Sequence, residues 1–164
     1  MFEREPALLV AKDESEALIG KVEDGSSLLR GRFGRFFDVA SRPYGPSRLV
    51  VGSDGTLESM TSDGKDWNKD EDTLTLPFST TGVTAECDMD DDKNLHVLGM
   101  RPVQGAFEIW YAGQKDRKWM EPEFVDSLDD KMDLRGFDIA ASNNYVVIVV
   151  SQGFSGKFLR RKLD

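Results

Sequence analysis

Phe37-Asp38-Val39-Ala40 is the stretch that decides the fold, because the chain echoes it twice. The echoes are Cys87-Asp88-Met89-Asp90 and Phe137-Asp138-Ile139-Ala140, so three aspartates stand 50 residues apart. A fixed period of this size indicates an array of one repeated supersecondary unit. The turn signals that follow each echo indicate a four-stranded antiparallel β-meander. We therefore predict an all-β, propeller-like fold with about three to three and a half blades, each blade being one meander.

The unit over residues 35–79 shows the pattern most clearly. Its second strand, over 48–52, leads into Ser53-Asp54-Gly55, and Asp-Gly is a strong signal for a tight hairpin. A third strand with alternating side chains follows over 56–61, and a second Asp-Gly turn stands at Asp63-Gly64. The order of strands and turns predicts one complete blade.

The same order predicts the rest of the array as one domain. The second complete unit covers 80–130, with strands over 85–89, 95–99 and 107–111 and a fourth beginning at Trp119. The flanking segments, 1–34 and 131–164, read as partial units. Because a repeat unit buries its faces only against its neighbours, we expect the partial sheets to need partner strands.

Residues 13–21 allow two interpretations. Asp13 could cap a short helix with Glu16 at its third position. Alternatively, residues 17–20 form a strand of the first partial unit, which is the interpretation that we favour.

Composition and charge narrow the functional class. The chain has 164 residues, 39% hydrophobic and 31% charged, as folded domains have. Its net charge of −9 argues against binding a nucleic-acid backbone, and the one cysteine, Cys87, excludes an intrachain disulfide. The N-terminus lacks a secretory h-region, and the longest apolar run, Tyr145 to Val150, is too short to span a membrane. We expect a cytoplasmic or virion protein.

One turn resembles a known motif. The segment Thr61-Ser62-Asp63-Gly64-Lys65-Asp66-Trp67 resembles the Asp-box of sialidase-type β-propellers, although Lys65 replaces the usual glycine and Trp67 comes one residue early. The resemblance implies that this turn joins the third and fourth strands of a blade. It also implies that Thr61, Asp63 and Gly64 form the structural turn and that Trp67 is buried beside it. The Asp-box is a folding device, so the resemblance implies no catalytic activity.

A run of oxygen-bearing side chains is a candidate calcium loop. Asp88, Asp90, Asp92 and Asn94 alternate as the first ligands of such a loop do. However, Lys93 stands where the loop needs glycine, and Gly99 stands where it needs a bidentate glutamate. The alternative, a solvated turn between two strands, is favoured, and we expect no metal and no cofactor.

Other candidate site residues have ordinary structural explanations. The only histidine, His96, lies in an apolar strand and is expected in the core, as is Cys87. Three aromatic residues could stack on a sugar, but alternation along the strand points one of the first two inward; these are Trp110, Tyr111 and Trp119. Packing within or between blades is the favoured explanation.

The two ends of the chain are candidate interfaces. Leu8, Leu9 and Val10 at one end, and Phe158 and Leu159 at the other, are expected to lie against each other or against another polypeptide. A basic cluster near the C-terminus either caps a solvated strand or docks on an acidic patch of another subunit; it comprises Lys157, Arg160, Arg161 and Lys162.

The sequence therefore favours a non-enzymatic module that acts by protein–protein contact. It shows no nucleophile–base pair and no phosphate-binding loop. Small, acidic, cysteine-poor β-modules with incomplete repeats suit a larger assembly, such as a virion tail, adaptor or head-decoration protein. The partners would be other subunits or copies of the chain. A carbohydrate-binding module related to glycan-processing propellers is the alternative.

Overall fold

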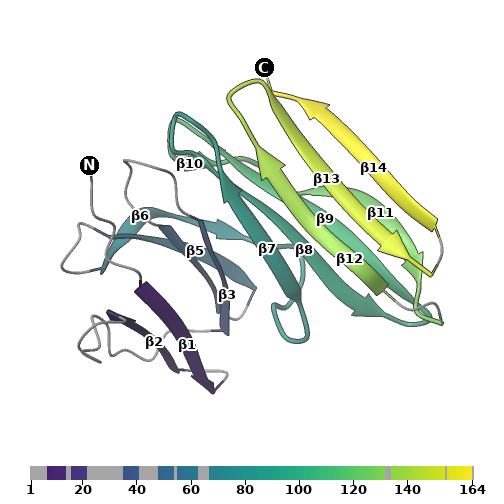
Figure 1. Ribbon diagram of the computed structural model, residues 1–164, viewed down its shortest axis with the longest axis horizontal. Helices are drawn as coiled ribbons and strands as arrows, with labels where there is room; N and C mark the ends of the chain where they lie inside the picture. The colour runs from purple at the N-terminus through teal and green to yellow at the C-terminus, as the bar shows by residue number, and fades with distance from the viewer. Residues whose placement is uncertain are drawn as a thin grey trace.

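The computed structural model describes residues 7–13, 16–21, 35–40, 48–53, 55–62, 67–131, 134–153 and 155–163. Within these ranges the chain forms β-strands and turns only, and every strand pairing is antiparallel (Figure 1). The all-β antiparallel prediction is confirmed. None of these residues belongs to a helix that is long and apolar enough to cross a membrane.

The strands fall into a hairpin and three meanders. The hairpin consists of β1 (Ala7–Asp13) and β2 (Glu16–Lys21). The first meander consists of β3 (Arg35–Ala40), β4 (Arg48–Ser53), β5 (Thr56–Ser62) and β6 (Trp67–Thr75). The middle meander consists of β7 (Thr84–Met89), β8 (Leu95–Val103), β9 (Ala106–Lys115), β10 (Lys118–Trp119) and β11 (Glu123–Asp129). The last meander consists of β12 (Leu134–Ala141), β13 (Tyr145–Gln152) and β14 (Ser155–Lys162).

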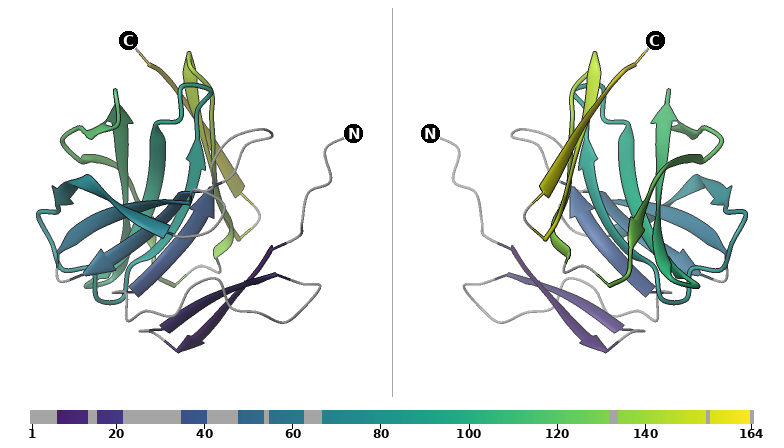
Figure 2. Two further views of the ribbon diagram at one scale, coloured as in Figure 1. Left: turned by 90° about the vertical axis from the view of Figure 1, so that its left-hand side faces the viewer. Right: turned by 90° about the vertical axis from the view of Figure 1, so that its right-hand side faces the viewer.

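The segment with two interpretations is a strand. Glu16–Lys21 forms β2 and pairs with β1 from Ala7↔Lys21 to Asp13↔Glu16. A helix over these residues would leave β1 without its hydrogen-bonded partner. The hairpin is set apart from the three meanders in both views of Figure 2.

The three repeated aspartates lie in equivalent strands at different registers. Asp38, Asp88 and Asp138 belong to β3, β7 and β12, the first strand of each meander. In register, Asp88 pairs with the second residue of the following strand, Asp38 with the third and Asp138 with the fifth. The pairing of β3 is irregular before Asp38 and that of β12 before Gly136, so these irregularities do not alter the partners of the aspartates. The sequence period thus marks the repeated strand, but not one repeated environment.

The middle meander has an additional strand. Lys118–Trp119 forms the short β10 on one part of β9, whereas β11 pairs with the rest of β9, from Ala106↔Asp129 to Tyr111↔Glu123. The fourth strand expected to begin at Trp119 therefore breaks after two residues and resumes at Glu123.

The meanders stack face to face through two apolar cores. Side chains of β8 alternate, so that Val97 packs toward the first meander and Leu98 toward the last. The first core joins Val50, Leu57, Leu74 and Leu76 to Ala85, Met89, Leu95, Val97 and Ala112. The second core joins Leu98, Met100, Ile109, Tyr111 and Leu128 to Ile139, Ala141, Val146, Ile148 and Val150. Figure 1 shows the resulting row, with the middle meander between the other two.

The row is open. β7 lies against both β3 and β12, so the first strands of the three meanders are neighbours. Within the described residues the sheets close into neither a ring nor a barrel. The structure therefore shows antiparallel meanders in a stack, with the middle one covered on both faces.

Candidate functional site

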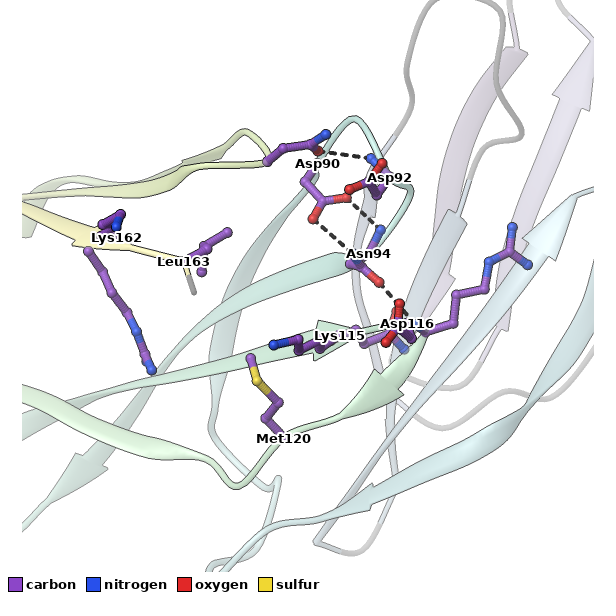
Figure 3. Close-up of a pocket in the computed structure, with 12 residues that line it drawn as sticks. Asp90, Asp92, Asn94, Lys115, Asp116, Met120, Lys162 and Leu163 are labelled. Carbon is purple, nitrogen blue, oxygen red and sulfur yellow. Dashed lines mark hydrogen bonds between the residues drawn. The ribbon is translucent and has the colours of Figure 1, made fainter.

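A pocket of about 630 Å³ lies where turns of the middle and last meanders meet the end of β14 (Figure 3). The β7–β8 turn contributes Asp90, Asp92 and Asn94, and the end of β9 with its turn contributes residues 114–117. Met120, Asn143 and residues 161–163 complete the lining. The lining carries charges of both signs.

The β7–β8 turn is held by its own polar side chains. Asn94 donates its backbone N–H to Asp90 Oδ1 at 2.7 Å and its side-chain amide to Asp90 Oδ2 at 2.9 Å. Between them Lys93 adopts a left-handed φ of 69°. Asp90 and Asn94 are both buried. This arrangement is a locally bonded turn, which is the alternative that the sequence favoured for these residues.

The four calcium candidates are divided among separate partners. Asp88 accepts a hydrogen bond from the backbone N–H of Ala141 in β12 at 2.8 Å, which links the middle and last meanders. Asp92 is exposed, and its backbone N–H donates to Asn143 Oδ1 at 3.0 Å. In the part of the chain that the structure describes, no three His, Cys, Asp or Glu side chains are grouped to hold a metal ion.

His96 connects this turn to the second core. It is 1% exposed; its Nε2 lies 3.2 Å from Asp90 Oδ2, and its Nδ1 lies 2.7 Å from Tyr111 Oη. Burial holds the pKa of His96 below its usual value, although Asp90 opposes this. The neutral ring then carries its proton on Nε2, which donates to the carboxylate, while Nδ1 accepts from the Tyr111 hydroxyl. Burial also raises the pKa of Tyr111, so the hydroxyl stays protonated and is a poor nucleophile.

The β9–β10 turn places two charged residues at the pocket in a strained backbone conformation. Asp116 and Arg117 have φ values of 51° and 63°, as the two central residues of a type I′ hairpin require. Such positions normally hold Asn or Gly, because other side chains crowd the backbone. The Arg117 backbone N–H donates to Asn94 Oδ1 at 2.9 Å, so one turn holds the other.

A buried cation lies behind the pocket, between the first and middle meanders. Arg48 is 0% exposed and forms an ion pair with Asp70. Its Nη1 also donates to Lys93 O and to Gln114 Oε1, both at 2.8 Å, and its Nη2 donates to Ser59 Oγ at 3.2 Å. These bonds fasten the start of β4 to the turns that line the pocket.

Asp70 completes this network. Ser59 Oγ donates to Asp70 Oδ2 at 2.5 Å and Thr61 Oγ1 donates to Asp70 Oδ1 at 2.8 Å. Burial alone would raise the pKa of Asp70, but the hydrogen bonds from Ser59 and Arg48 hold it below its usual value. The network therefore keeps a charged pair at the edge of the first core.

The Asp-box candidate is described only in part. Residues 63–66 join β5 to β6, the third and fourth strands of the first meander, but Asp63 and Gly64 lie outside the described residues. Trp67 begins β6 and pairs with Ser62, and its side chain also lies outside the description. The hydroxyl of Thr61 bonds to Asp70 in β6.

The three aromatic candidates do not form one platform. Tyr111 faces the second core and is 2% exposed, whereas Trp110 points to the opposite face. Trp119 packs against the first core, and its backbone N–H donates to Asp72 Oδ2 at 2.5 Å. The alternation expected for Trp110 and Tyr111 is confirmed, and His96 is in the core as expected. Cys87 is half-buried against the first core.

The basic C-terminal cluster divides between the two faces of β14. Lys157 Nζ lies 2.5 Å from Asp126 Oδ2, and Arg161 Nη1 lies 2.5 Å from Glu123 Oε2, so these two cations pair with β11 of the same chain. Arg160 instead stacks on Tyr145, with its guanidinium carbon 3.6 Å from the ring centroid. Two cations of the basic cluster therefore form ion pairs with carboxylates of the same chain.

The terminal segments do not pair with each other. Leu8, Leu9 and Val10 lie in β1, which pairs with β2, while Phe158 and Leu159 lie in β14, which pairs with β13. β1 and β14 stand at opposite ends of the long axis in Figure 1. Contact of either segment with another polypeptide stays a prediction.

Three residues that organise the pocket escaped the sequence analysis: Arg48, Gln114 and Arg117. Arg48 was placed only as the first residue of the predicted strand over 48–52, and Gln114 and Arg117 fall between the predicted strand over 107–111 and the one expected from Trp119. The one available signal in the sequence was Arg48, which begins an apolar strand and stands next to a third strand rich in serine and threonine.

Two comparisons with known proteins found no match. No protein-family model matches the chain, and no curated protein is significantly similar to it.

Proposed function

We propose that this chain is a non-enzymatic structural module whose propeller-like meanders join copies of the chain into a larger assembly. One observation carries the proposal. The middle meander is covered on both faces, whereas the last meander is stacked on one face only and presents apolar side chains on the other.

The outer face of the last meander has the composition of a contact surface. Phe158 is 67% exposed and pairs in register with Val149, which is 39% exposed. Val147 and the exposed Ala140 form the next cross-strand pair on this face. By contrast, Ile139 and Ile148 on the inner face are buried in the second core. Exposed neighbouring apolar side chains on one sheet face mark an interaction site.

Charge indicates what covers this face. On its inner side β14 uses Lys157 and Arg161 to meet the carboxylates of β11. On its outer side Arg160 lies beside the apolar pairs, next to Tyr145. A complementary sheet would have an apolar centre and a carboxylate opposite Arg160. The chain has 30 acidic and 21 basic residues, so a second copy offers the required surplus of carboxylates.

The assembly is tested by measuring native mass. We expect the wild-type protein to form oligomers in light scattering or native mass spectrometry, and Phe158→Ser to shift it toward the monomer. The matched control is Phe124→Ser, because Phe124 is 54% exposed but lies on β11. A wild-type protein that stays monomeric at high concentration, or a control that dissociates equally, would contradict the proposal.

The kind of assembly is a further part of the proposal. An acidic chain with one cysteine and repeated meanders suits a virion component such as a tail, adaptor or head-decoration protein. Co-sedimentation of the chain with intact particles from its source is the measurement that checks this.

Carbohydrate binding is a second candidate, favoured by one aromatic cluster. Trp110 packs against Phe78 at a centroid distance of 5.1 Å and against the exposed Phe124 at 5.7 Å. Beside the rings, Arg101 Nε and Trp110 Nε1 both donate to Glu108 Oε2, at 2.7 and 3.2 Å. Aromatic faces next to a fixed polar pair suit a sugar ring. Glycan-array binding that disappears in Trp110→Ala would favour this candidate over the structural one.

A further inference from the structure

We propose that the pocket at the ends of the middle and last meanders binds a small molecule through an oxyanion, either a carboxylate or a phosphate. Most of the lining belongs to turns of the middle and last meanders, and only Lys162 is shared with the face of β14 that carries Phe158 and Arg160. The inference therefore goes beyond the proposed assembly role and can fail without affecting it.

The side chain of Gln114 carries a buried hydrogen-bond donor without an acceptor among the described residues. Gln114 is 2% exposed and lines the pocket. Its Oε1 accepts from Arg48 Nη1 at 2.8 Å and from the backbone N–H of Leu95 at 3.1 Å. Two donors on one oxygen fix which end of the amide is which. Nε2 is then a buried donor with no hydrogen-bond partner among the described residues, and folded proteins rarely leave such a group unpaired.

Two cations in the lining of the same pocket, Arg117 and Lys162, have no ion-pair partner among the described residues. Asp90 already accepts bonds from Asn94 and lies beside His96, so its carboxylate is occupied by the protein. Arg117 and Lys162 also line the pocket, are exposed, and form no ion pair with any described residue. Guanidinium and ammonium groups that line the same pocket as a buried amide donor suit the several lone pairs of an oxyanion.

The positions of these groups make the site selective. The backbone of Arg117 is held by its hydrogen bond to Asn94 and by the left-handed turn, so the turn that carries this cation is formed before any ligand arrives. Figure 3 shows Asp90 and Asn94 on one side of the pocket and Lys162 and Leu163 on another. Exposed Asp92 and Asp116 bring negative charge to the same pocket. We therefore expect the ligand to place its oxyanion near Gln114 and to carry hydroxyl or amino groups elsewhere.

The size of the pocket sets the class of ligand. A volume of about 630 Å³ lies within the range of small-molecule sites, roughly 300–1,000 Å³. Inorganic phosphate alone would leave most of this space to water. The oxyanion is thus one group of a larger metabolite-sized molecule.

The test uses citrate and inorganic pyrophosphate as probes in isothermal titration calorimetry, with sodium chloride at matched ionic strength. We expect saturable one-site binding of at least one probe to the wild-type protein. Citrate alone would identify a carboxylate ligand, and pyrophosphate alone a phosphate ligand. Absence of saturable binding with both would overturn the proposal.

The decisive variant is Gln114→Glu. It keeps an acceptor for Arg48 and for Leu95 and replaces only Nε2 by an oxygen that repels an oxyanion. We expect normal folding by circular dichroism and affinity weakened by at least about tenfold. Affinity close to wild type in a folded variant would refute the role of Gln114 and with it the proposal.

A matched pair of surface variants makes the result independent of whether Gln114→Glu folds. Lys162→Gln removes a cation of the pocket, whereas Lys157→Gln removes one from the same strand that pairs with Asp126 outside it. We expect the affinity for the probe to fall about tenfold in Lys162→Gln and to stay at the wild-type value in Lys157→Gln. An equal loss in both would show that the probes respond only to overall charge.

Discussion

The two stacking interfaces of the middle meander use different chemistry at the same end of the stack. Between the first and middle meanders, the buried Arg48 forms an ion pair with the half-buried Asp70 and bonds to Gln114. Between the middle and last meanders, a neutral His96 bonds to Tyr111 and Asp90. One interface thus holds a fixed charge, and the other holds a group that can gain a charge near physiological pH.

The difference shows how similar layers acquire unlike stabilities. A buried charged pair binds its interface tightly only while both partners are present, because either one alone is a buried, unpaired charge. A buried neutral histidine needs no charged partner. When the pH falls and the ring is protonated, however, the buried charge weakens the interface. The first interface should therefore be sensitive to mutation and the second to pH.

Removing Arg48 should have the largest effect. In Arg48→Met, Asp70 loses its cation, and Gln114 and Ser59 lose a donor, so we expect the free energy of unfolding to fall by about 3–5 kcal/mol. Urea unfolding measures the change. The control is Lys69→Met in the same meander, because Lys69 pairs with Glu58 at the surface, where such pairs contribute about 0–1 kcal/mol. Equal losses in the two variants would show that Arg48 is no anchor.

Crowding Tyr111 should have the next largest effect, on the second interface. A Cβ at Gly113 would lie 2.3 Å from Tyr111 Oη, so the hydroxyl must leave His96. We expect Gly113→Ala to cost about 1–3 kcal/mol in thermal or urea unfolding.

Two further variants check this explanation. A Cβ at Gly99 would meet Val83 at an ordinary 3.7 Å, so Gly99→Ala should be nearly neutral. Adding Tyr111→Phe to Gly113→Ala removes the closest atom and should recover part of the loss. No recovery would mean that the cost arises elsewhere than at the hydroxyl.

Acid should separate the two interfaces. The pKa of His96 lies below its usual 6.5 because of burial, so the unfolded chain binds the proton first. The free energy of unfolding should then decrease as the pH falls below about 6.5, by at most about 1.4 kcal/mol per pH unit. The pKa of Asp70 is lowered from 3.8, so the stability it contributes should persist until the pH falls below about 4.

Urea unfolding between pH 7 and pH 4 measures this difference. The charged groups that act on His96 are Asp90, Asp88 and Arg161, and all three remain in His96→Gln. We expect the variant to lose the part of the slope near pH 6. An unchanged profile would assign the slope to other groups.

The surface pair between β14 and β11 should have the smallest effect. Lys157 and Asp126 are 55% and 28% exposed, so Lys157→Gln should cost about 0–1 kcal/mol. The loss should shrink further in high salt, because exposed charges are screened. A large, salt-independent loss would mean that this contact holds the last meander in place.

The strands were predictable from the sequence where alternation and turn chemistry agree. Tyr145–Gln152 pairs over its whole length with β14 and from Val146 to Gln152 with β12, and its apolar run was a strong strand signal. The fourth strand of the middle meander was expected to begin at Trp119, but its break before β11 (Glu123–Asp129) was not predicted, because the carboxylates of that segment do not mark a strand by local pattern. Glu123 and Asp126 in fact face Arg161 and Lys157 on a strand that lies more than thirty residues further along the chain, a relation that local patterning cannot reveal.

The pocket was less predictable, because several of its residues stand in places that are unusual for their type, such as a glycine inside a strand and a buried arginine. Gly113 falls just after the predicted strand over 107–111, yet it lies inside the longer β9, where the absence of a side chain leaves room for Tyr111. Arg48 entered an apolar strand, and only the fold reveals Asp70 and Gln114 beside it. Asp90 and Asn94 were recognised as turn residues or ligands, but their bonds to each other and to the neighbouring turn depend on tertiary placement.

The coverage of the middle meander on both faces has a consequence for how the molecule opens. Each meander is built from strands close in sequence, so a meander can fray as a unit without unthreading the rest. The outer layers can detach singly, whereas β8 and β9 become accessible to water only after a neighbour has left. Amide hydrogens of Val97, Leu98 and Ile109 should therefore exchange with deuterium last, and their protection should report the stability of the entire stack.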